Sequence, residues 1–164
     1  MGVMTMAIAA GAAALFPVEQ AIAPEAIVEQ SVTASDVYQK ATLRNRIIMT
    51  DFVTILYEKR QPRVAFEKYV HEGYIQHNPI IADGRENALK WLEPVFSKQD
   101  AEIQVRRVLV DGDFATVQII GRMSPEDPGS AIINIFRLED GLIVEHWDVT
   151  QAMPAATASG RPLG

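Results

Sequence analysis

The sequence of 164 residues contains no cysteine and only three histidines. Without cysteine the chain has no structural disulfide, no thiolate zinc site and no thiol nucleophile. It also lacks a glycine-rich phosphate loop and a serine in a nucleophile-elbow context, which argues against nucleotide cofactors and serine-based catalysis. Any chemistry must therefore come from His, Asp, Glu or Tyr side chains, or from another bound group.

Positive charge is also scarce, since 15 Lys and Arg residues face 21 Asp and Glu residues, for a net charge of -6. A nucleic-acid-binding surface needs a clustered basic face, and the pair Arg106-Arg107 is too short to provide one. We therefore expect no nucleic-acid partner. The length and the hydrophobic content of 48% predict one compact globular domain.

No apolar run reaches the roughly 20 residues that span a bilayer, so no membrane span is expected. Residues 4–16 are uncharged and apolar, and Ala21-Ile22-Ala23 fits a small-residue cleavage site. Residues 1–23 thus indicate either a secretory signal peptide or an apolar N-terminal helix. The first alternative predicts a periplasmic or secreted protein, and the second a cytoplasmic one. Against a signal, no Lys or Arg precedes the run and Pro24 would follow the cut.

Helical patterns fill the first part of the chain after residues 24–41, which read as a linker or an irregular helix. Residues 43–58 place apolar side chains at the spacing of one helical face. These side chains are Ile47, Ile48, Phe52, Ile55 and Leu56. Gln61-Pro62 begins a shorter helix that Gly73 would end, and Asp83 is a plausible cap for a helix through residues 86–96.

The period changes to that of strands after residue 100. Four strand-like segments, near 103–110, 114–123, 131–138 and 142–150, follow one another, and two Asp-Gly pairs supply hairpin signals. Helices first and an antiparallel meander second predict an α+β domain whose helices cover one face of a curved sheet. Residues 152–164 are rich in Ala, Gly and Pro and predict a flexible tail.

Polar side chains gather in two places, Tyr74–Pro79 (YIQHNP) and His146-Trp147-Asp148. In an extended strand alternate side chains share a face, so His146 and Asp148 lie on the same side and Trp147 on the other. One face of this strand therefore carries an acid–base pair.

These motifs, together with two amphipathic helices and the ending FRLEDGLIVEHWDV, resemble the SnoaL-like (polyketide cyclase-like) branch of the NTF2-like superfamily over residues 42–151. The resemblance implies a cone-shaped α+β barrel, in which N-terminal helices pack on a curved antiparallel sheet and enclose a mostly apolar cavity. It also implies a homodimer through the sheet. Members include cyclases, isomerases, dehydratases and lyases alongside binding-only proteins, so the fold does not fix the activity.

The resemblance places the cavity aspartate of the cyclases at Asp148, which we predict to be the general base. His146 would orient it or shuttle the proton, and His77, held by Pro79, would act as general acid or donor to an oxyanion. The alternative is that His146 and Asp148 only fix local geometry, and that His77 and Asn78 only satisfy backbone groups.

The predicted function is a cofactor-independent acid–base enzyme for a small hydrophobic or aromatic substrate that carries a carbonyl or hydroxyl group. The reaction would be an aldol or retro-aldol cleavage, a cyclisation, a dehydration or an isomerisation. The predicted substrate-binding residues are Tyr74, Asn78, Trp91, Phe114 and Phe136. No metal is predicted, because the histidines and aspartates match no standard zinc or iron spacing. The alternative is a non-catalytic small-molecule-binding module.

Overall fold

The computed structural model describes residues 24–163. Two compact units are distinguished, Met1–Ala34 and Ser35–Gly164, and the strands of the described residues all lie in the second. Residues 1–23, which the sequence assigns to a signal peptide or an apolar helix, lie outside the described residues. Within the described range, no helix is both long and apolar enough to cross a membrane.

The first helix, α1, is Pro24–Val53. Of the two alternatives for residues 24–41, the structure therefore has a helix and not a linker, and this helix continues into the predicted one. Proline suits a first helical turn, and the Ala, Glu, Gln and Lys residues that follow it are good helix formers. A π-helical turn, η1 (Thr54–Glu58), continues from α1, and two shorter helices follow, α2 (Pro62–Tyr69) and α3 (Arg85–Ser97).

The buried face of α1 differs in part from the predicted one. Phe52 is fully buried as expected, but Ile47 is 73% exposed and Met49 is buried in its place. At about 100° per residue, Ile47 lies some 200° from Met49 and faces away from the sheet. The wider π-helical turn then buries three consecutive side chains, Ile55, Leu56 and Tyr57.

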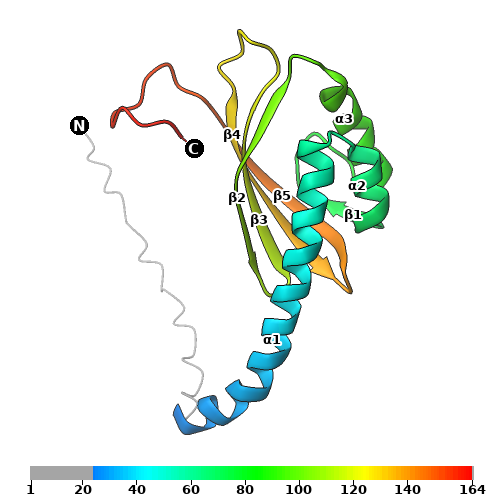
Figure 1. The fold of residues 1–164 in the computed structure, drawn as a ribbon, viewed down its shortest axis with the longest axis vertical. Helices are drawn as coiled ribbons and strands as arrows, with labels where there is room; N and C mark the ends of the chain where they lie inside the picture. The colour runs from blue at the N-terminus through cyan, green and yellow to red at the C-terminus, as the bar shows by residue number, and fades with distance from the viewer. Residues whose placement is uncertain (1–23, 164) are drawn as a thin grey trace, which may run out of the picture. The chain divides into compact units, whose positions relative to one another are not determined.

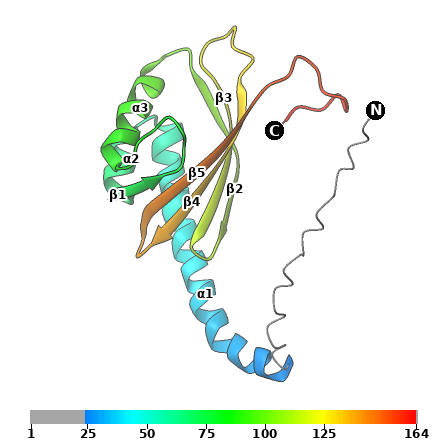
Figure 2. The same ribbon diagram turned by 180° about the vertical axis from the view of Figure 1, so that it is seen from behind.

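Five strands form one sheet in the order β1-β5-β4-β3-β2. Their bounds are β1 Val70–Gln76, β2 Glu102–Asp111, β3 Phe114–Arg122, β4 Ser130–Glu139 and β5 Leu142–Ala152. The predicted meander from β2 to β5 is confirmed, but β1 pairs in parallel with β5, so the sheet is mixed and not wholly antiparallel. Figures 1 and 2 show α2 and α3 covering one face of this sheet.

The β1 strand begins earlier than predicted, since the sequence pattern assigns its residues 70–73 to the end of a helix and only the YIQHNP segment to a strand. The α2 helix stops at Tyr69, and the β-branched Val70 pairs with Ile143 of β5. The Asp83 carboxylate also has a different role from the predicted helix cap. The cap of α3 is Gly84, whereas Asp83 Oδ1 accepts a hydrogen bond of 2.8 Å from the backbone N–H of Gln76. Asp83 therefore holds the end of β1.

Both predicted Asp-Gly hairpins form. Asp140 and Gly141 have positive φ angles of 49° and 84°, as a two-residue type I′ turn requires. The apolar core lies between the helices and one face of the sheet, with Phe52 and Leu89 from the helices meeting Val117 and Phe136 from the strands.

Arg60 joins the end of η1 to the end of α3. Its guanidinium donates hydrogen bonds of 2.7–2.9 Å to the backbone carbonyls of Phe96, Lys98 and Ala101. We expect Arg60→Ala to lower the free energy of unfolding by about 2–3 kcal/mol, because charge-assisted bonds to these carbonyls are lost. Urea unfolding measures this change. The exposed Arg46 in α1 is the control, and Arg46→Ala should change the stability by less than about 0.5 kcal/mol. Equal losses for the two variants would contradict the role of Arg60.

Candidate active site

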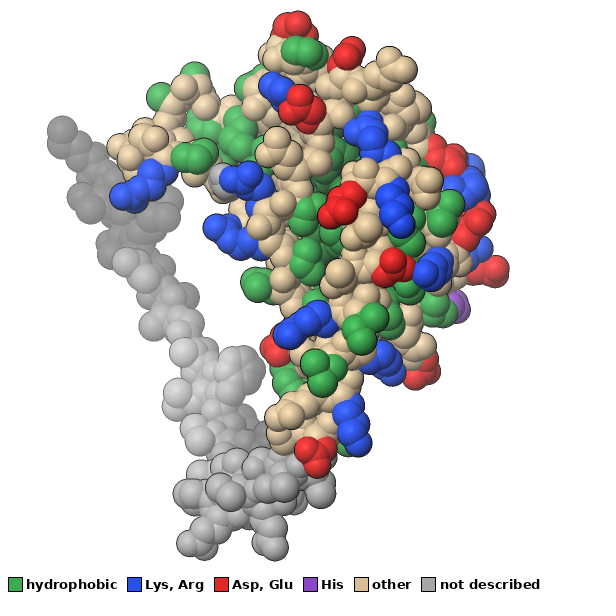
Figure 3. Space-filling view, viewed as in Figure 1, with side chains coloured by type: hydrophobic (Ala, Val, Ile, Leu, Met, Phe, Trp, Pro, Cys, Tyr) green, Lys and Arg blue, Asp and Glu red, His purple; other side chains and the backbone are tan. Residues whose placement is uncertain are grey.

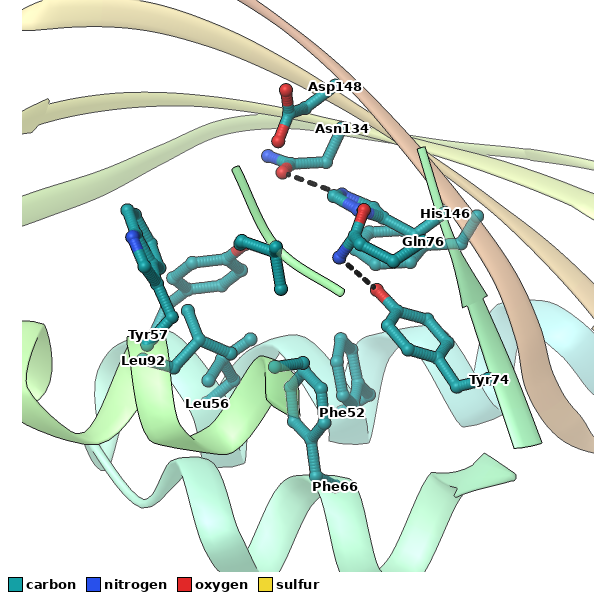
Figure 4. Close-up of a pocket in the computed structure, with 14 residues that line it drawn as sticks. Phe52, Leu56, Tyr57, Phe66, Tyr74, Gln76, Leu92, Asn134, His146 and Asp148 are labelled. Carbon is teal, nitrogen blue, oxygen red and sulfur yellow. Dashed lines mark hydrogen bonds between the residues drawn. The ribbon is translucent and has the colours of Figure 1, made fainter. Parts of the chain in front are cut away.

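Two adjoining hollows lie between the helices and the sheet. The inner cavity, about 70 Å³, has Phe52 and Phe66 on the helix side and Asn134 and His146 on the sheet side (Figure 4). The outer cleft, about 680 Å³, extends from it between α3 and the strands. The residues that line both are Tyr57, Trp91, Leu92, Asn134 and Asp148. Figure 3 shows apolar side chains reaching the surface between the strands and the helices.

Asp148 stands where the inner cavity meets the outer cleft. It is half-buried in β5 opposite Asn134 of β4. The side-chain amide of Asn78 donates a hydrogen bond of 2.6 Å to Asp148 Oδ2. The other end of the same amide, Asn78 Oδ1, accepts the backbone N–H of Ile80 at 3.0 Å. Asn78 is thus fixed by its own loop and orients the Oδ2 atom of Asp148. The other carboxylate oxygen, Asp148 Oδ1, can therefore accept a hydrogen bond or a proton from a bound substrate.

His146 lines the inner cavity but does not pair with Asp148. Its Nδ1 lies 2.8 Å from Gln76 Oε1 and its Nε2 lies 3.2 Å from Asn134 Oδ1. The pKa of His146 is lowered to about 4, chiefly by burial; the carboxylate of Asp148 acts in the opposite direction, and His77 adds a smaller effect in the same direction as burial. The imidazole is therefore neutral at pH 7. The predicted direct pair of His146 and Asp148 does not form, and the side-chain amides of Gln76 and Asn134 flank the imidazole instead.

The buried imidazole predicts a stability that falls in mild acid. Its pKa is depressed in the folded state relative to about 6.5 in the unfolded state, so the unfolded chain takes up the proton first. The contribution of His146 to the free energy of unfolding is fully present above pH 6.5. It is lost as the pH falls toward 4, which lowers the free energy of unfolding by about 3 kcal/mol at most. Urea unfolding between pH 7.5 and pH 4.5 measures this slope. His146→Gln should reduce the slope, and His71→Gln, at an exposed position, should leave it unchanged. An unchanged slope in His146→Gln would contradict the assignment.

His77 does not reach either hollow, and its predicted place in the cavity is wrong. Its Nε2 lies 2.8 Å from Glu145 Oε1, and its ring stacks on Trp147 with 4.8 Å between centroids. Glu145 also accepts a bond of 2.7 Å from Arg137, and these two partners lower its pKa. Gln76 points inward to His146, so the next side chain points to the outer face of the sheet.

Phe114 also lies away from the cavity, contrary to the prediction. It is 48% exposed and contacts Trp147 on the outer face, because the inward positions of β3 are Ala115 and Val117. The other predicted substrate-binding residues do line the hollows. Tyr74 and Phe136 line the inner cavity, Asn78 lines the outer cleft, and Trp91 lines both. In the part of the chain that the structure describes, no three His, Asp or Glu side chains are close enough to hold a metal ion.

Two further cavity residues were missed by the sequence reasoning, Asn134 and Tyr57. Asn134 is the one polar residue in the segment AIINIF, a signal that marks it in retrospect. Tyr57 is hidden in the pattern because the π-helical turn breaks the α-helical period. It is only 9% exposed, points into the cavity (Figure 4), and its hydroxyl has no hydrogen-bond partner among residues 24–163. Burial and the charge of Asp148 raise the pKa of Tyr57, so its hydroxyl stays protonated and can donate.

The family model for the SnoaL-like domain matches residues 49–146. The chain belongs to this SnoaL-like family. The match covers β1, α3 and the meander and ends two residues before Asp148. Comparison with curated proteins found no match.

Solved structures similar to this SnoaL-like chain share its fold at low sequence identity. An NTF2-like protein from Mesorhizobium loti is 20% identical, with a TM-score of 0.59 and coverage of 68% of this chain and 93% of that one. A candidate ketosteroid isomerase from Kribbella flavida is 20% identical, with a TM-score of 0.56 and coverage of 75% and 85%. A candidate SnoaL-like polyketide cyclase from Jannaschia sp. is 20% identical, with a TM-score of 0.53 and coverage of 68% and 88%.

Proposed function

We propose that this SnoaL-like protein is a cofactor-independent acid–base enzyme that moves a proton next to the carbonyl group of a hydrophobic, ring-containing substrate. The observation that carries the proposal is that an oriented carboxylate, Asp148, and the hydroxyl-bearing side chain of Tyr57, which has no hydrogen-bond partner among residues 24–163, both line the junction of the two hollows. A proton acceptor beside a hydrogen-bond donor in an apolar enclosure suits this chemistry.

The step begins with the substrate carbonyl accepting a hydrogen bond from the Tyr57 hydroxyl. Asp148 Oδ1 takes a proton from the neighbouring carbon, the C–H bond breaks, and its electron pair moves to form an enolate. The negative charge develops on the carbonyl oxygen, where the Tyr57 hydrogen bond strengthens. The protonated Asp148 then returns the proton to a carbon or a leaving oxygen. Isomerisation, aldol addition, aldol-type cyclisation and dehydration of a β-hydroxy ketone all follow from this enolate. In retro-aldol cleavage Asp148 instead takes the proton of a β-hydroxyl group, a new carbonyl forms, and the electron pair of the broken carbon–carbon bond gives the enolate that Tyr57 stabilises.

His146 has a positioning role in this scheme. It is neutral and buried between Gln76 Oε1 and Asn134 Oδ1, and its single N–H can donate to one of these two oxygens. Gln76 Oε1 also accepts the backbone N–H of Asn78 at 2.9 Å, and Asn78 in turn holds Asp148. The network links the ring to the carboxylate through Asn78. The homodimer stays a prediction, and the outer face of the sheet around Phe114 and Trp147 is where it would form.

Hydrogen–deuterium exchange tests the proposal without knowledge of the natural product. The protein is incubated in D₂O with uncharged aryl ketones and aromatic β-hydroxy ketones, and NMR follows loss of the proton next to the carbonyl. We expect exchange or cleavage of at least one ketone above the buffer rate. Ketones that bind without exchange or turnover would instead identify a non-catalytic binding module.

A further inference from the structure

The outer cleft has a direction and a length. Its lining residues extend from Asn134 and Asp148 to Ser130 and to Asp127 of the loop between β3 and β4. Ser130 and Asn134 are four residues apart on β4, which corresponds to about 13 Å at the rise of a strand. The walls between these ends are apolar, with Val95 of α3 opposite Ile119 and Ile132 of the sheet, among others.

Charge in the cleft has a single sign. Asp148 at the inner end and Asp127 at the outer end line it, and no Lys, Arg or His is among its described lining residues. The nearby Arg122 is directed to Glu102, with bonds of 2.7 Å and 3.1 Å. The charge of Arg122 also acts on Asp127 from outside the cleft, but the described lining residues themselves include two carboxylates and no cation.

Asp127 is held in place as an anion. Its Oδ2 accepts the backbone N–H of Met123 at 2.7 Å, and its Oδ1 accepts that of Gly129 at 2.9 Å. These two bonds lower the pKa of Asp127, so it stays ionised at neutral pH. An anionic group placed at this end would lose its hydration and meet a fixed negative charge.

We propose that the substrate of the outer cleft is an elongated, uncharged molecule about 13 Å long, with its carbonyl at Asp148 and no anionic group at the end beside Asp127. Asp127 is then a specificity-determining residue that excludes carboxylates, phosphates and other anions. The inference rests on the proposed function for the position of the carbonyl. The net charge of -6 acts in the same direction at longer range.

A matched pair of rigid two-ring ketones tests this exclusion. Methyl 6-acetyl-2-naphthoate is uncharged, and 6-acetyl-2-naphthoate differs from it by one negative charge at the end away from the ketone. Isothermal titration calorimetry at pH 7.5 should show the ester binding at least tenfold more tightly than the acid. Equal or tighter binding of the acid, or binding of neither compound, would overturn the proposal.

Two variants test whether Asp127 is the residue that discriminates between the ester and the acid. Asp127→Asn should reduce the ester-to-acid ratio at least threefold, by improving binding of the acid. Glu126→Gln removes the same charge from the neighbouring exposed residue, which does not line the cleft, and should keep the wild-type ratio. A ratio unchanged in Asp127→Asn, or reduced equally in both variants, would overturn the role of Asp127. If Asp127→Asn does not fold, as judged by thermal melting, the wild-type ratio still decides the charge preference.

The two proposals fail in different ways. Failure of the proposed function leaves ketones bound but unexchanged in D₂O, whatever their charge. Failure of the charge preference leaves exchange intact while the acid binds as well as the ester.

Discussion

Asp148→Asn is expected to lower the rate of proton exchange next to the ketone by about a thousandfold, the contribution typical of a positioned general base. An amide has nearly the same shape as the carboxylate but accepts no proton. Its oxygen can still receive the hydrogen bond from Asn78, so the loop over the cleft should keep its position. The measurement is the initial exchange rate by NMR, with ketone affinity determined separately by calorimetry. Ketone binding should change by less than about threefold, because the affected interaction belongs to the transition state.

Two controls separate this effect from a general loss of activity. His77→Ala removes a titratable ring from the outer face and should keep the exchange rate within about twofold of wild type, given the distance of that ring from both hollows. Glu126→Gln removes an exposed carboxylate that does not line the cleft and should also retain exchange of uncharged ketones. Full activity in Asp148→Asn would eliminate the proposed mechanism.

Tyr57→Phe is expected to lower the same rate by about a hundredfold, which is the usual effect of removing one donor to a developing oxyanion. The phenylalanine ring fills the same space, and the lost hydroxyl has no partner among the described residues. The free energy of unfolding should therefore stay nearly the same, because no hydrogen bond to the described residues is lost and the ring keeps its packing. Exchange rates and urea unfolding on the same preparation test both statements.

Tyr69→Phe is the matched control, since the Tyr69 hydroxyl bonds Asp51 at 2.6 Å and lines neither hollow. It should lose stability and keep its exchange rate, the reverse of Tyr57→Phe. A Tyr57→Phe variant as active as wild type would remove the hydroxyl from the mechanism and leave Asp148 as its sole tested member.

The sequence predicted most of the fold because its signals are local. The two Asp-Gly pairs mark the hairpins, and strand alternation correctly put His146 and Asp148 on one face. The same alternation decides to which face of the sheet His77 points, but which of the two faces this is depends on how β1 pairs with β5. That pairing is parallel and non-local, so the motif YIQHNP alone does not tell which of Gln76 and His77 points inward.

Other errors have equally specific causes. Phe114 is aromatic, as cavity walls often are, but the alternation of side chains along β3 puts it on the outer face of the sheet. Tyr57 was overlooked because an α-helical period assigns it no place next to Ile55 and Leu56, although all three are buried. Packing, which propensity does not report, decides both positions.

The π-helical turn Thr54–Glu58 also has an evolutionary consequence. Such a turn is equivalent to one residue inserted into an α-helix, and the backbone bond from Lys59 N to Thr54 O, 2.9 Å long, spans it. Loss of one residue here would restore a regular helix and rotate the following side chains by about 100°. A relative with the shorter helix would gain helical stability and lose the inward hydroxyl. Insertion or deletion of a single residue in this turn would therefore change helix stability and the position of the Tyr57 hydroxyl together, in opposite directions for stability and activity.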